Sequence, residues 1–479
     1  MQEERNTENK FDSCIRFLKS LQKFNPKDVV KGTYVMNLDS IKALLNLLDN
    51  PQDKLSFVHV AGTNGKGSTC MFIASILKES GYTTGLFTSP YLTHLNEQIC
   101  IDGVEISDKD AGEYLSIVIE KVEILRKEQS IFPSEFEIIV SAAFLYFVSK
   151  KCDIVVLEVG LGGDMDATNV ISKSALSVIT PISFDHIDIL GDSYKSIASH
   201  KAGIIKKDGC VLIAPQNSEA QTVIKQKCKD MNAELITANM EHEVICQNMY
   251  GQEFVHPVFG TIKIKMAGDY QIENAIVAAS AAAILGKKGF NKISGKSIAL
   301  GLERALWPCR LEILGTNPVT IYDGSHNIQG IDMLCRNLRR LFPGKKIRFV
   351  VGFLQDKNYE KMALKLGEIA EKFYTVEPVS VRALSAKKLA EFLIQSGYEA
   401  QAFAPSNDSL SSIEILSGKN VFEKNMPKKL VQYEKDGQVE GDPKYAMKKA
   451  LQKAVSESKK NDIICVCGSF YFVGILKSM

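Results

Sequence analysis

Residues 58–69 read Val-His-Val-Ala-Gly-Thr-Asn-Gly-Lys-Gly-Ser-Thr. A β-rich run over 56–61 precedes this loop, and an amphipathic helical pattern begins at Ser68. Glycine has no Cβ, so a glycine-rich loop can expose successive backbone N–H groups to a phosphate. Lys66 adds a positive charge, and Ser68 adds a hydroxyl group that can bind magnesium. The stretch therefore predicts a strand–loop–helix unit that holds a nucleotide phosphate at the amino end of the helix.

Two positions depart from the strict phosphate-loop pattern. Val60 stands where that pattern has glycine, and Gly67 follows the lysine where it has serine or threonine. The alternative interpretation is a glycine-rich turn with a solvated lysine. We favour phosphate binding because strand, loop, lysine, hydroxyl and helix follow one another in the required order.

The composition is that of a globular protein with a small-molecule partner. Of 479 residues, 45% are hydrophobic and 24% are charged, and 58 basic against 56 acidic residues leave a net charge of +2. Such a balance gives no general attraction to nucleic acid or to a membrane surface. The length predicts two or three domains.

Several features predict a cytoplasmic protein, which we expect to be a monomer. The sequence opens with the charged segment Met-Gln-Glu-Glu-Arg-Asn. Its longest apolar runs, 138–148 and 275–285, are too short to span a bilayer. The eleven cysteines are scattered, and several lie inside apolar runs, as expected of reduced thiols. Cys465 and Cys467 lack metal-site spacing and are predicted to pack in a core.

Strands that alternate with helices predict an α/β fold, with a phosphate loop in a doubly wound, mostly parallel sheet. We place the first domain at 1–306 and a smaller C-terminal Rossmann-like α/β domain at 307–479, because the segment 306–310 breaks a helical pattern. Residues 233–266 predict a small antiparallel excursion. The polar stretch 405–442 predicts a loop or insert. The predicted strands lie near 56–61, 83–87, 153–157, 175–180, 209–213, 319–323, 347–353, 372–376 and 463–467.

Polar residues at the ends of predicted strands are candidate ligands, because parallel sheets bind ligands at their carboxyl edge. Glu158 ends the apolar strand 153–157, where it can hold magnesium directly or through water; a merely exposed carboxylate is the alternative. His186 follows the strand 175–180, and a structural histidine is the alternative there. Composition alone predicts that Lys201 is a solvated lysine on a helix.

The second domain offers a similar strand end. Tyr-Asp-Gly-Ser-His at 322–326 closes a strand with Asp323 and His326, although a plain Asx turn explains the spacing equally well. Arg310 lies near the boundary, where an ordinary surface arginine is the alternative.

These motifs together resemble the folylpolyglutamate synthase and dihydrofolate synthase family of the Mur ligase superfamily. They run in order along the chain from about residue 56 to residue 474. The matching segments are 62–68 (GTNGKGS), 88–90 (TSP), 158–163 (EVGLGG), 166–169 (DATN), 185–186 (DH), 200–204 (HKAGI), 273–274 (EN), 307–310 (WPCR), 323–327 (DGSHN) and 467–474 (CGSFYFVG).

The resemblance implies an ATP-binding, Mur-ligase-like first domain with a folate site and a glutamate-ligase second domain. It also implies roles for residues that spacing alone leaves open. The ATP-contacting set is Gly62, Asn64, Gly65, Lys66, Gly67, Ser68, Asn274, Arg310, Asp323 and His326. The magnesium set is Ser89, Glu158 and His186, the substrate-binding set is Phe136, Ser89 and Asp166, and the catalytic set is Lys66, Lys201, His186 and Glu158.

The implied reaction is ATP-dependent amide formation between a folate or dihydropteroate carboxylate and L-glutamate through an acyl phosphate. The implied cofactors are Mg²⁺, a monovalent cation and a carbamate on Lys201, which would turn a cation into a carboxylate. Two alternatives stay open: a Mur-type ligase acting on a cell-wall precursor, and an ATP-binding module without turnover. The Thr-Ser-Pro and Trp-Pro-x-Arg elements favour the folate branch.

One position departs from the family pattern. The segment 96–98 reads Asn-Glu-Gln, where the family pattern has Asn-Glu-Arg. The guanidinium missing at Gln98 leaves recognition of a substrate carboxylate there open.

Overall fold

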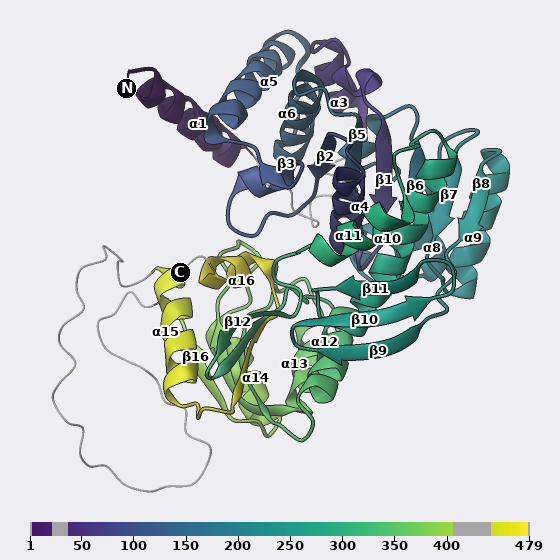
Figure 1. Cartoon of the computed structure of the whole chain (residues 1–479). Helices are drawn as coiled ribbons and strands as arrows, with labels where there is room; N and C mark the ends of the chain where they lie inside the picture. Colours follow the sequence, from purple (N-terminus) through teal and green to yellow (C-terminus); the bar gives the residue numbers. More distant parts are fainter. Residues whose placement is uncertain (1, 22–36, 406–441, 478–479) are drawn as a thin grey trace, which may run out of the picture. The chain divides into compact units, whose positions relative to one another are not determined.

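The computed structural model describes residues 2–21, 37–405 and 442–477, with side chains from residue 10 onward. The chain divides into two compact units, Met1–Trp307 and Pro308–Met479 (Figure 1). The units are described separately below. The predicted insert at 405–442 lies, apart from its two end residues, outside the described residues.

The first unit is built on an eight-stranded sheet with the order β4-β3-β2-β5-β1-β6-β7-β8. In the order β2-β5-β1-β6-β7-β8 all neighbouring strands pair in parallel, whereas β3 pairs antiparallel with both β2 and β4 at one edge. The mixed, mostly parallel sheet confirms the predicted fold class. Its strands are β1 (Phe57–Ala61), β2 (Thr84–Phe87), β3 (Ile99–Ile101), β4 (Val104–Glu105), β5 (Ile154–Glu158), β6 (Leu176–Ile179), β7 (Cys210–Ile213) and β8 (Glu234–Thr237).

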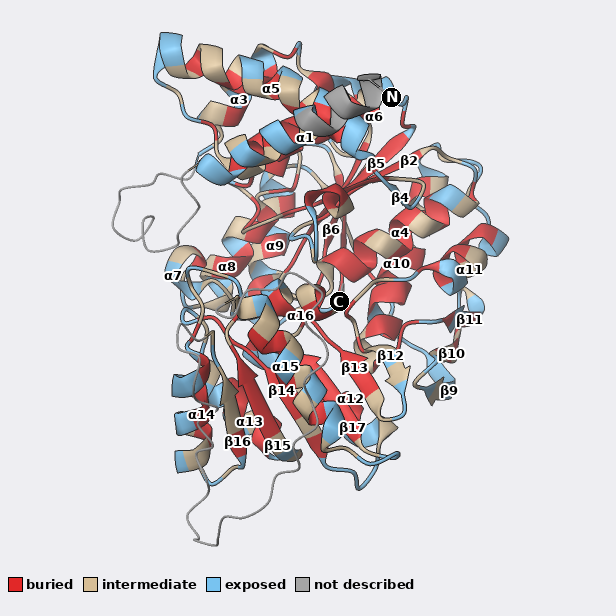
Figure 2. Ribbon diagram, turned by 90° about the vertical axis from the view of Figure 1, so that its left-hand side faces the viewer, coloured by how far each residue is buried: buried red, intermediate tan, exposed pale blue. Residues whose placement is uncertain are grey.

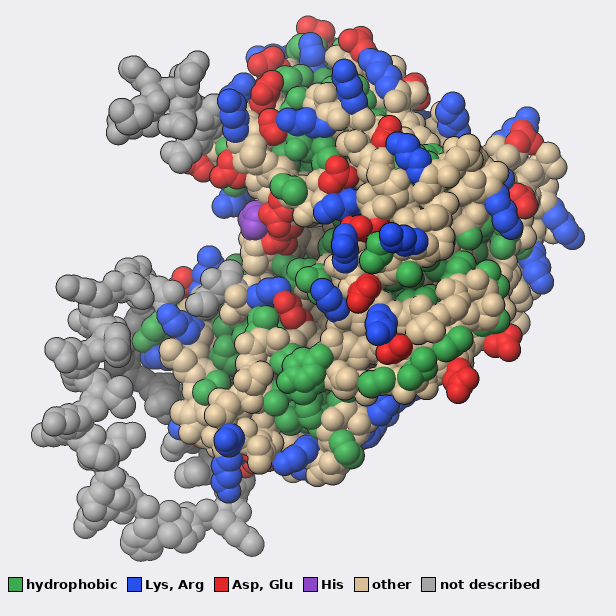
Figure 3. All heavy atoms as spheres, in the orientation of Figure 1, with side chains coloured by type: hydrophobic (Ala, Val, Ile, Leu, Met, Phe, Trp, Pro, Cys, Tyr) green, Lys and Arg blue, Asp and Glu red, His purple; other side chains and the backbone are tan. Residues whose placement is uncertain are grey.

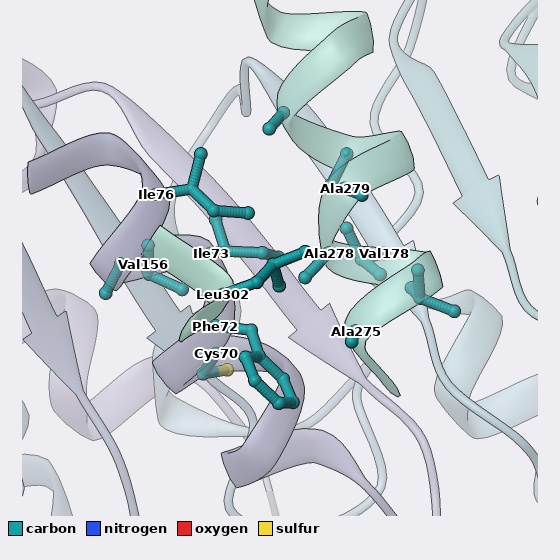
Figure 4. Close-up of a cluster of buried hydrophobic side chains, with 14 of the residues drawn as sticks. Cys70, Phe72, Ile73, Ile76, Val156, Val178, Ala275, Ala278, Ala279 and Leu302 are labelled. Carbon is teal, nitrogen blue, oxygen red and sulfur yellow. The ribbon is translucent and has the colours of Figure 1, made fainter. Parts of the chain in front are cut away.

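Helices cover both faces of this sheet, and the central strands are buried throughout (Figure 2). One face packs against α4 (Lys66–Glu79), α10 (Asp269–Lys287) and α11 (Gly295–Arg304) in the core that Figure 4 shows. The opposite face packs against two groups of helices. These are α1 (Gln2–Ser20), α3 (Asp39–Asn46), α5 (Asp108–Gln129) and α6 (Glu135–Ser149), and then α8 (Tyr194–Ala202) and α9 (Ser218–Asp230).

The predicted antiparallel excursion at 233–266 is correct only in its second part. Residues 234–237 form β8, which extends the main sheet in parallel with β7. The separate three-stranded antiparallel sheet consists of β9 (Glu243–Asn248), β10 (Gly251–His256) and β11 (Gly260–Ile264). The alternation of β10 explains its role, because Phe254 is fully buried against the α4–α10 core while its neighbours are partly exposed.

The second unit holds a six-stranded sheet with the order β12-β13-β17-β14-β15-β16, in which β12 alone is antiparallel. The edge strands β12 and β16 were not predicted from the sequence. The strands are β12 (Glu312–Thr316), β13 (Val319–Tyr322), β14 (Ile347–Val351), β15 (Ala370–Val376), β16 (Ala400–Phe403) and β17 (Ile463–Cys467). The helices are α12 (Ile328–Leu341), α13 (Tyr359–Gly367), α14 (Ala386–Gln395), α15 (Pro443–Ser456) and α16 (Phe470–Lys477).

Cys465 and Cys467 are fully buried in β17, as the sequence predicts, and all eleven cysteines are free thiols. Acidic and basic side chains are interspersed over the face that Figure 3 shows. Within the described ranges, we find no helix with both the length and the apolar character needed to cross a bilayer.

Candidate active site

The predicted phosphate loop joins the carboxyl end of β1 to α4. Gly65 is the N-cap residue of α4 and has a left-handed backbone with φ of +83°. The N-cap residue makes no side-chain capping hydrogen bond to the first turn of this helix. Lys66 is the first helical residue, and Asn64 precedes Gly65 in the loop. An uncapped helix amino terminus after a glycine loop fits an anionic phosphate.

Helix α10 supports the loop from the side. The hydroxyl of Thr69 donates a 3.5 Å hydrogen bond to Asn274 Oδ1, and the amide of Gln271 donates a 3.2 Å hydrogen bond to Ser68 Oγ. Asn274 Nδ2 in turn donates to Gln271 Oε1 at 3.1 Å. The family resemblance implies a role for Asn274 but none for Gln271, which lies one helical turn earlier on the same face. These contacts fix the first turn of α4.

Gly65→Ala is expected to lower ATP affinity at least about tenfold while the protein still folds. A Cβ at this position would lie 2.3 Å from Asn274 Oδ1, and alanine is strained at positive φ. Gly81 has a similar φ of +78° but open space around an added Cβ, so Gly81→Ala is the matched control for backbone strain. Equilibrium binding of a non-hydrolysable ATP analogue measures the difference. Equal affinity of both variants would contradict the loop assignment.

Two lysines flank the phosphate loop. Lys66 Nζ donates to Thr63 O at 3.3 Å, and Lys201 Nζ, from the last turn of α8, donates to Gly62 O at 2.7 Å. Lys201 is only 5% exposed, so the composition-based interpretation of a solvated lysine is wrong. Burial, together with the positive charge of Lys66, lowers the pKa of Lys201 to about 7. Tertiary packing of α8 causes this burial, and a local pattern cannot report it.

The predicted metal ligands lie at or after the carboxyl ends of three strands of the sheet. Glu158 is the buried last residue of β5, and its Oε2 accepts a 3.3 Å hydrogen bond from the backbone N–H of Ser89, which follows β2. His186 caps α7 (Ile187–Leu190) after β6 with a left-handed backbone, and its Nε2 lies 3.9 Å from Asp185 Oδ1. The structure thus brings Ser89 and Glu158 together.

The residues present fit Mg²⁺ better than a softer metal. In the described part of the chain, no group of three or more His, Cys, Asp or Glu side chains is placed to hold a metal ion by itself. Mg²⁺ is characteristically held by one or two carboxylates together with substrate phosphates and water. A single buried carboxylate beside a phosphate loop meets that description.

Phe136 and Asp166 lie together over the loop that follows β5. An added Cβ at Gly160 would be 2.8 Å from the Phe136 ring and 3.2 Å from Asp166 Oδ2, so both side chains contact that glycine. The Phe136 ring also lies 5.9 Å from the ring of Phe87, between centroids. The structure therefore assembles an aromatic face and a carboxylate next to the segment 158–163.

The Asp166 carboxylate is buried and held by its own loop. Oδ2 accepts from the Leu161 N–H at 2.8 Å, and Oδ1 accepts from the Thr168 N–H at 3.0 Å and from the Thr168 hydroxyl at 2.5 Å. Burial raises the pKa of Asp166, and these hydrogen bonds oppose the rise. Thr168 belongs to the 166–169 motif, yet sequence reasoning assigned it no role.

Gln98 is buried rather than open to a ligand, and its Oε1 has no hydrogen-bond partner in the described structure. The preceding Glu97 accepts hydrogen bonds from the backbone N–H groups of Leu92 and Thr93 at 2.6 and 2.9 Å. The segment 92–98 is thus braced by Glu97. A charged guanidinium at position 98 would be costly unless it found an acidic partner.

In the second unit, Arg310 and His326 both lie against Phe470. The Arg310 guanidinium lies 4.4 Å from the centre of the Phe470 ring, and the His326 ring lies 5.5 Å from it. Asp323 accepts hydrogen bonds from the N–H groups of Leu311 and Ser325, both at 2.9 Å. Asp323 thus holds the residue that follows Arg310, while Arg310 and His326 share Phe470 as a neighbour. Phe470 lies in the 467–474 motif, but its contact with Arg310 and His326 was not predicted.

Two family models match the chain. The Mur ligase middle domain matches residues 60–282, and the glutamate ligase domain of Mur ligases matches residues 309–420. These matches cover the phosphate loop, the residues around Asp166, and Arg310, Asp323 and His326 of the second unit. They confirm the predicted superfamily.

Individual relatives agree with the family models. The dihydrofolate synthase/folylpolyglutamate synthase of Bacillus subtilis is 36% identical over 359 residues, which are 74% of this chain and 83% of that protein. The folylpolyglutamate synthase of Lacticaseibacillus casei is 35% identical over 368 residues, or 75% of this chain and 83% of that protein. A solved folylpolyglutamate synthase complex with AMPPCP and folate superimposes with a TM-score of 0.76 at 26% identity, covering 98% of each chain. The chain therefore belongs to the folylpolyglutamate synthase and dihydrofolate synthase family of ATP-dependent Mur-type ligases.

Proposed function

We propose that this chain uses ATP to join the carboxylate of a folate to the amine of L-glutamate, releasing ADP and phosphate. The proposed acceptors are dihydropteroate, which carries no glutamate, and tetrahydrofolate with one or more glutamates already attached. The observation that carries the proposal is the phosphate loop flanked by Lys66 and Lys201, on the sheet edge that also bears Glu158. The relatives' names supply the acceptor class.

Phe136 and Asp166 are the proposed binding residues for the pterin ring. An aromatic face stacks on a flat heterocycle. The ring's amino group and adjacent N–H are donors, which a carboxylate oxygen can accept. Asp166 Oδ2 already receives the Leu161 N–H, and it also contacts the glycine beneath Phe136.

Activation is required because a carboxylate does not react with an amine when oxide must leave. An oxygen of the acceptor carboxylate attacks the γ-phosphorus of ATP, the bond to the β-phosphate oxygen breaks, and ADP leaves. The amine of glutamate then attacks the acyl carbon, and phosphate leaves with the oxygen that came from the carboxylate. Lys66 and the N–H groups of α4 balance the charge that develops on the transferred group.

Ser89, Glu158 and His186 are the proposed residues for holding Mg²⁺. When bound, the ion supplies charge neutralisation at the phosphate oxygens. A monovalent cation and a carbamate on Lys201 are further proposed cofactors. Asn274 is proposed to act at the nucleotide beside Gly65, and Arg310, Asp323 and His326 keep nucleotide binding as their proposed role in the second unit.

Glu158→Gln is expected to raise the Mg²⁺ concentration required for half-maximal activity about tenfold or more. The amide keeps the shape and the hydrogen bond to the Ser89 N–H but removes the negative charge that attracts the ion. Rates measured across a Mg²⁺ titration at saturating ATP test this. The exposed Glu105→Gln is the control, and an unchanged requirement in Glu158→Gln would remove Glu158 from the metal site.

The test of the function is ADP release by purified protein supplied with ATP, Mg²⁺, L-glutamate and either dihydropteroate or tetrahydrofolate. ADP and the glutamylated product are expected in equal amounts with at least one acceptor. Activity with neither acceptor would refute the folate assignment. The enzyme is further proposed to work as a cytoplasmic monomer with small-molecule substrates, which gel filtration and fractionation can check.

A further inference from the structure

His59 is a buried polar residue in the middle of β1. Its side chain is 0% exposed, although the neighbouring Val58 and Val60 show that the strand accepts apolar residues readily. Nε2 lies 2.9 Å from Thr168 Oγ1, whereas Nδ1 is buried and has no hydrogen-bond partner in the described structure. An apolar residue would avoid this unpaired atom, so the Nε2 contact needs an explanation beyond packing.

The hydrogen-bond directions around Thr168 are determined by its single hydroxyl proton. A carboxylate only accepts hydrogen bonds, so the Thr168 hydroxyl donates its proton to Asp166 Oδ1 at 2.5 Å. Thr168 Oγ1 must then accept from His59, which places the imidazole proton on Nε2. Burial, with the charge of Lys206 as a further cause, keeps the pKa of His59 well below its usual value, so the ring is neutral. Donation therefore runs from His59 through Thr168 to Asp166.

The hydrogen bonds from His59 and Thr168 end at Asp166, the carboxylate proposed to bind the acceptor. Asp166 Oδ1 is held by both donors of Thr168, and Oδ2 lies close to Gly160, to which the Phe136 ring is also close. Polarising the Thr168 hydroxyl strengthens its bond to Asp166. The same bond fixes the rotation of the carboxylate, so that Oδ2 stays directed toward the ring site. We propose that His59 is a positioning residue for acceptor binding, which acts on Asp166 through the hydroxyl of Thr168.

This proposal rests on the proposed function, because it takes Asp166 as an acceptor-binding group. It adds a consequence that the phosphate loop alone does not give. His59 lies three residues before Gly62 on the strand that carries the loop, yet its contacts lead to Asp166. A change at His59 should therefore weaken acceptor binding and leave ATP binding largely unaltered.

Substituting Asn or Gln for His59 distinguishes the contributions of the two ring nitrogens. The amide nitrogen of glutamine is as many bonds from Cβ as Nε2, and that of asparagine is as many bonds from Cβ as Nδ1. His59→Asn should raise KM for dihydropteroate, or for tetrahydrofolate if that is the acceptor used, about tenfold. His59→Gln should stay within about threefold of the wild type. KM for ATP and kcat should change less than about threefold in both.

A double-mutant cycle tests the route through Thr168. Thr168→Val should raise KM for the acceptor, Thr168→Ser should preserve it, and His59→Asn combined with Thr168→Val should be no worse than Thr168→Val alone. The Thr168 pair also decides the matter if His59→Asn fails to fold. Equal KM changes for ATP and acceptor, additive effects in the cycle, or a KM for the acceptor unchanged in His59→Asn or Thr168→Val would overturn the proposal.

Turnover by the wild-type protein distinguishes a failure of the proposed function from a failure of the proposed role of His59. Wild-type protein that turns over neither acceptor refutes the proposed function. Equilibrium dialysis of dihydropteroate then tests the role of His59 independently, with weaker binding expected for His59→Asn than for His59→Gln. If the wild type turns over an acceptor but His59→Asn binds that acceptor with unaltered affinity, only the proposed role of His59 is refuted.

Discussion

Lys66→Ala is expected to lower kcat for glutamate addition by about 10²- to 10³-fold while leaving the fold intact. Lys66 is the first residue of α4, where its ammonium group can reach a phosphate held by the loop. The charge that develops during phosphoryl transfer is spread over the phosphoryl oxygens, so a missing cation acts on the transition state more than on the ground state. Steady-state ADP release, with thermal unfolding as the check on folding, measures the effect.

Lys78→Ala is the matched control, because Lys78 lies in the last turn of the same helix and is exposed. It should retain wild-type activity. Lys66→Arg should recover part of the lost rate, since it restores the charge with a different shape. Near-normal turnover by Lys66→Ala would contradict the assignment of the loop to phosphoryl transfer.

Lys201→Met is expected to reduce activity by about 10²-fold or more and to abolish carbamate formation. We propose that the neutral amine of Lys201 attacks carbon dioxide, forms a C–N bond and releases a proton. With a pKa of about 7, much of this amine is neutral near pH 7.5, whereas an ordinary lysine is roughly one part in a thousand neutral there. Bicarbonate carrying a carbon label, followed by NMR of the wild-type protein, should reveal the carbamate carbon.

The pH dependence of this signal follows from the same value. Below about pH 7 the amine takes up a proton, so the carbamate signal and the activity should fall together. Lys206 is the control, because its burial likewise lowers its pKa, to about 8, while its Nζ bonds Asn169. Lys206→Met should keep the signal. A wild-type spectrum without a carbamate, in a fully active enzyme, would refute the proposal for Lys201.

Local patterns predicted the features that local physics determines. The glycine spacing of 62–67 and the apolar face of the following helix were sufficient for the strand–loop–helix unit, because loop freedom and helix periodicity are short-range properties. The strand ends at Glu158 and Asp323 were likewise visible, since an acid interrupts an apolar run. The alternation of strands and helices then gave the parallel sheet.

Contacts between residues far apart in the chain determine the features that sequence patterns did not predict. Lys201 is buried because α8 packs beneath the loop of Gly62, over a hundred residues earlier in the chain. The bond from His59 to Thr168 spans a similar separation, and β8 joins the main sheet through its register with β7. No periodicity records such contacts. The family resemblance supplied a role for Lys201, and the structure supplied its burial.

The most direct test of the account uses an acceptor whose carboxylate carries a heavy oxygen isotope. Purified protein is incubated with this acceptor, ATP, Mg²⁺ and L-glutamate, and the phosphate and the glutamylated product are analysed by mass spectrometry. The account predicts one amide product per ADP and one labelled oxygen in each phosphate, because the acyl phosphate passes its bridging oxygen to the leaving group. Phosphate without label, or ADP released without an amide product, would contradict it.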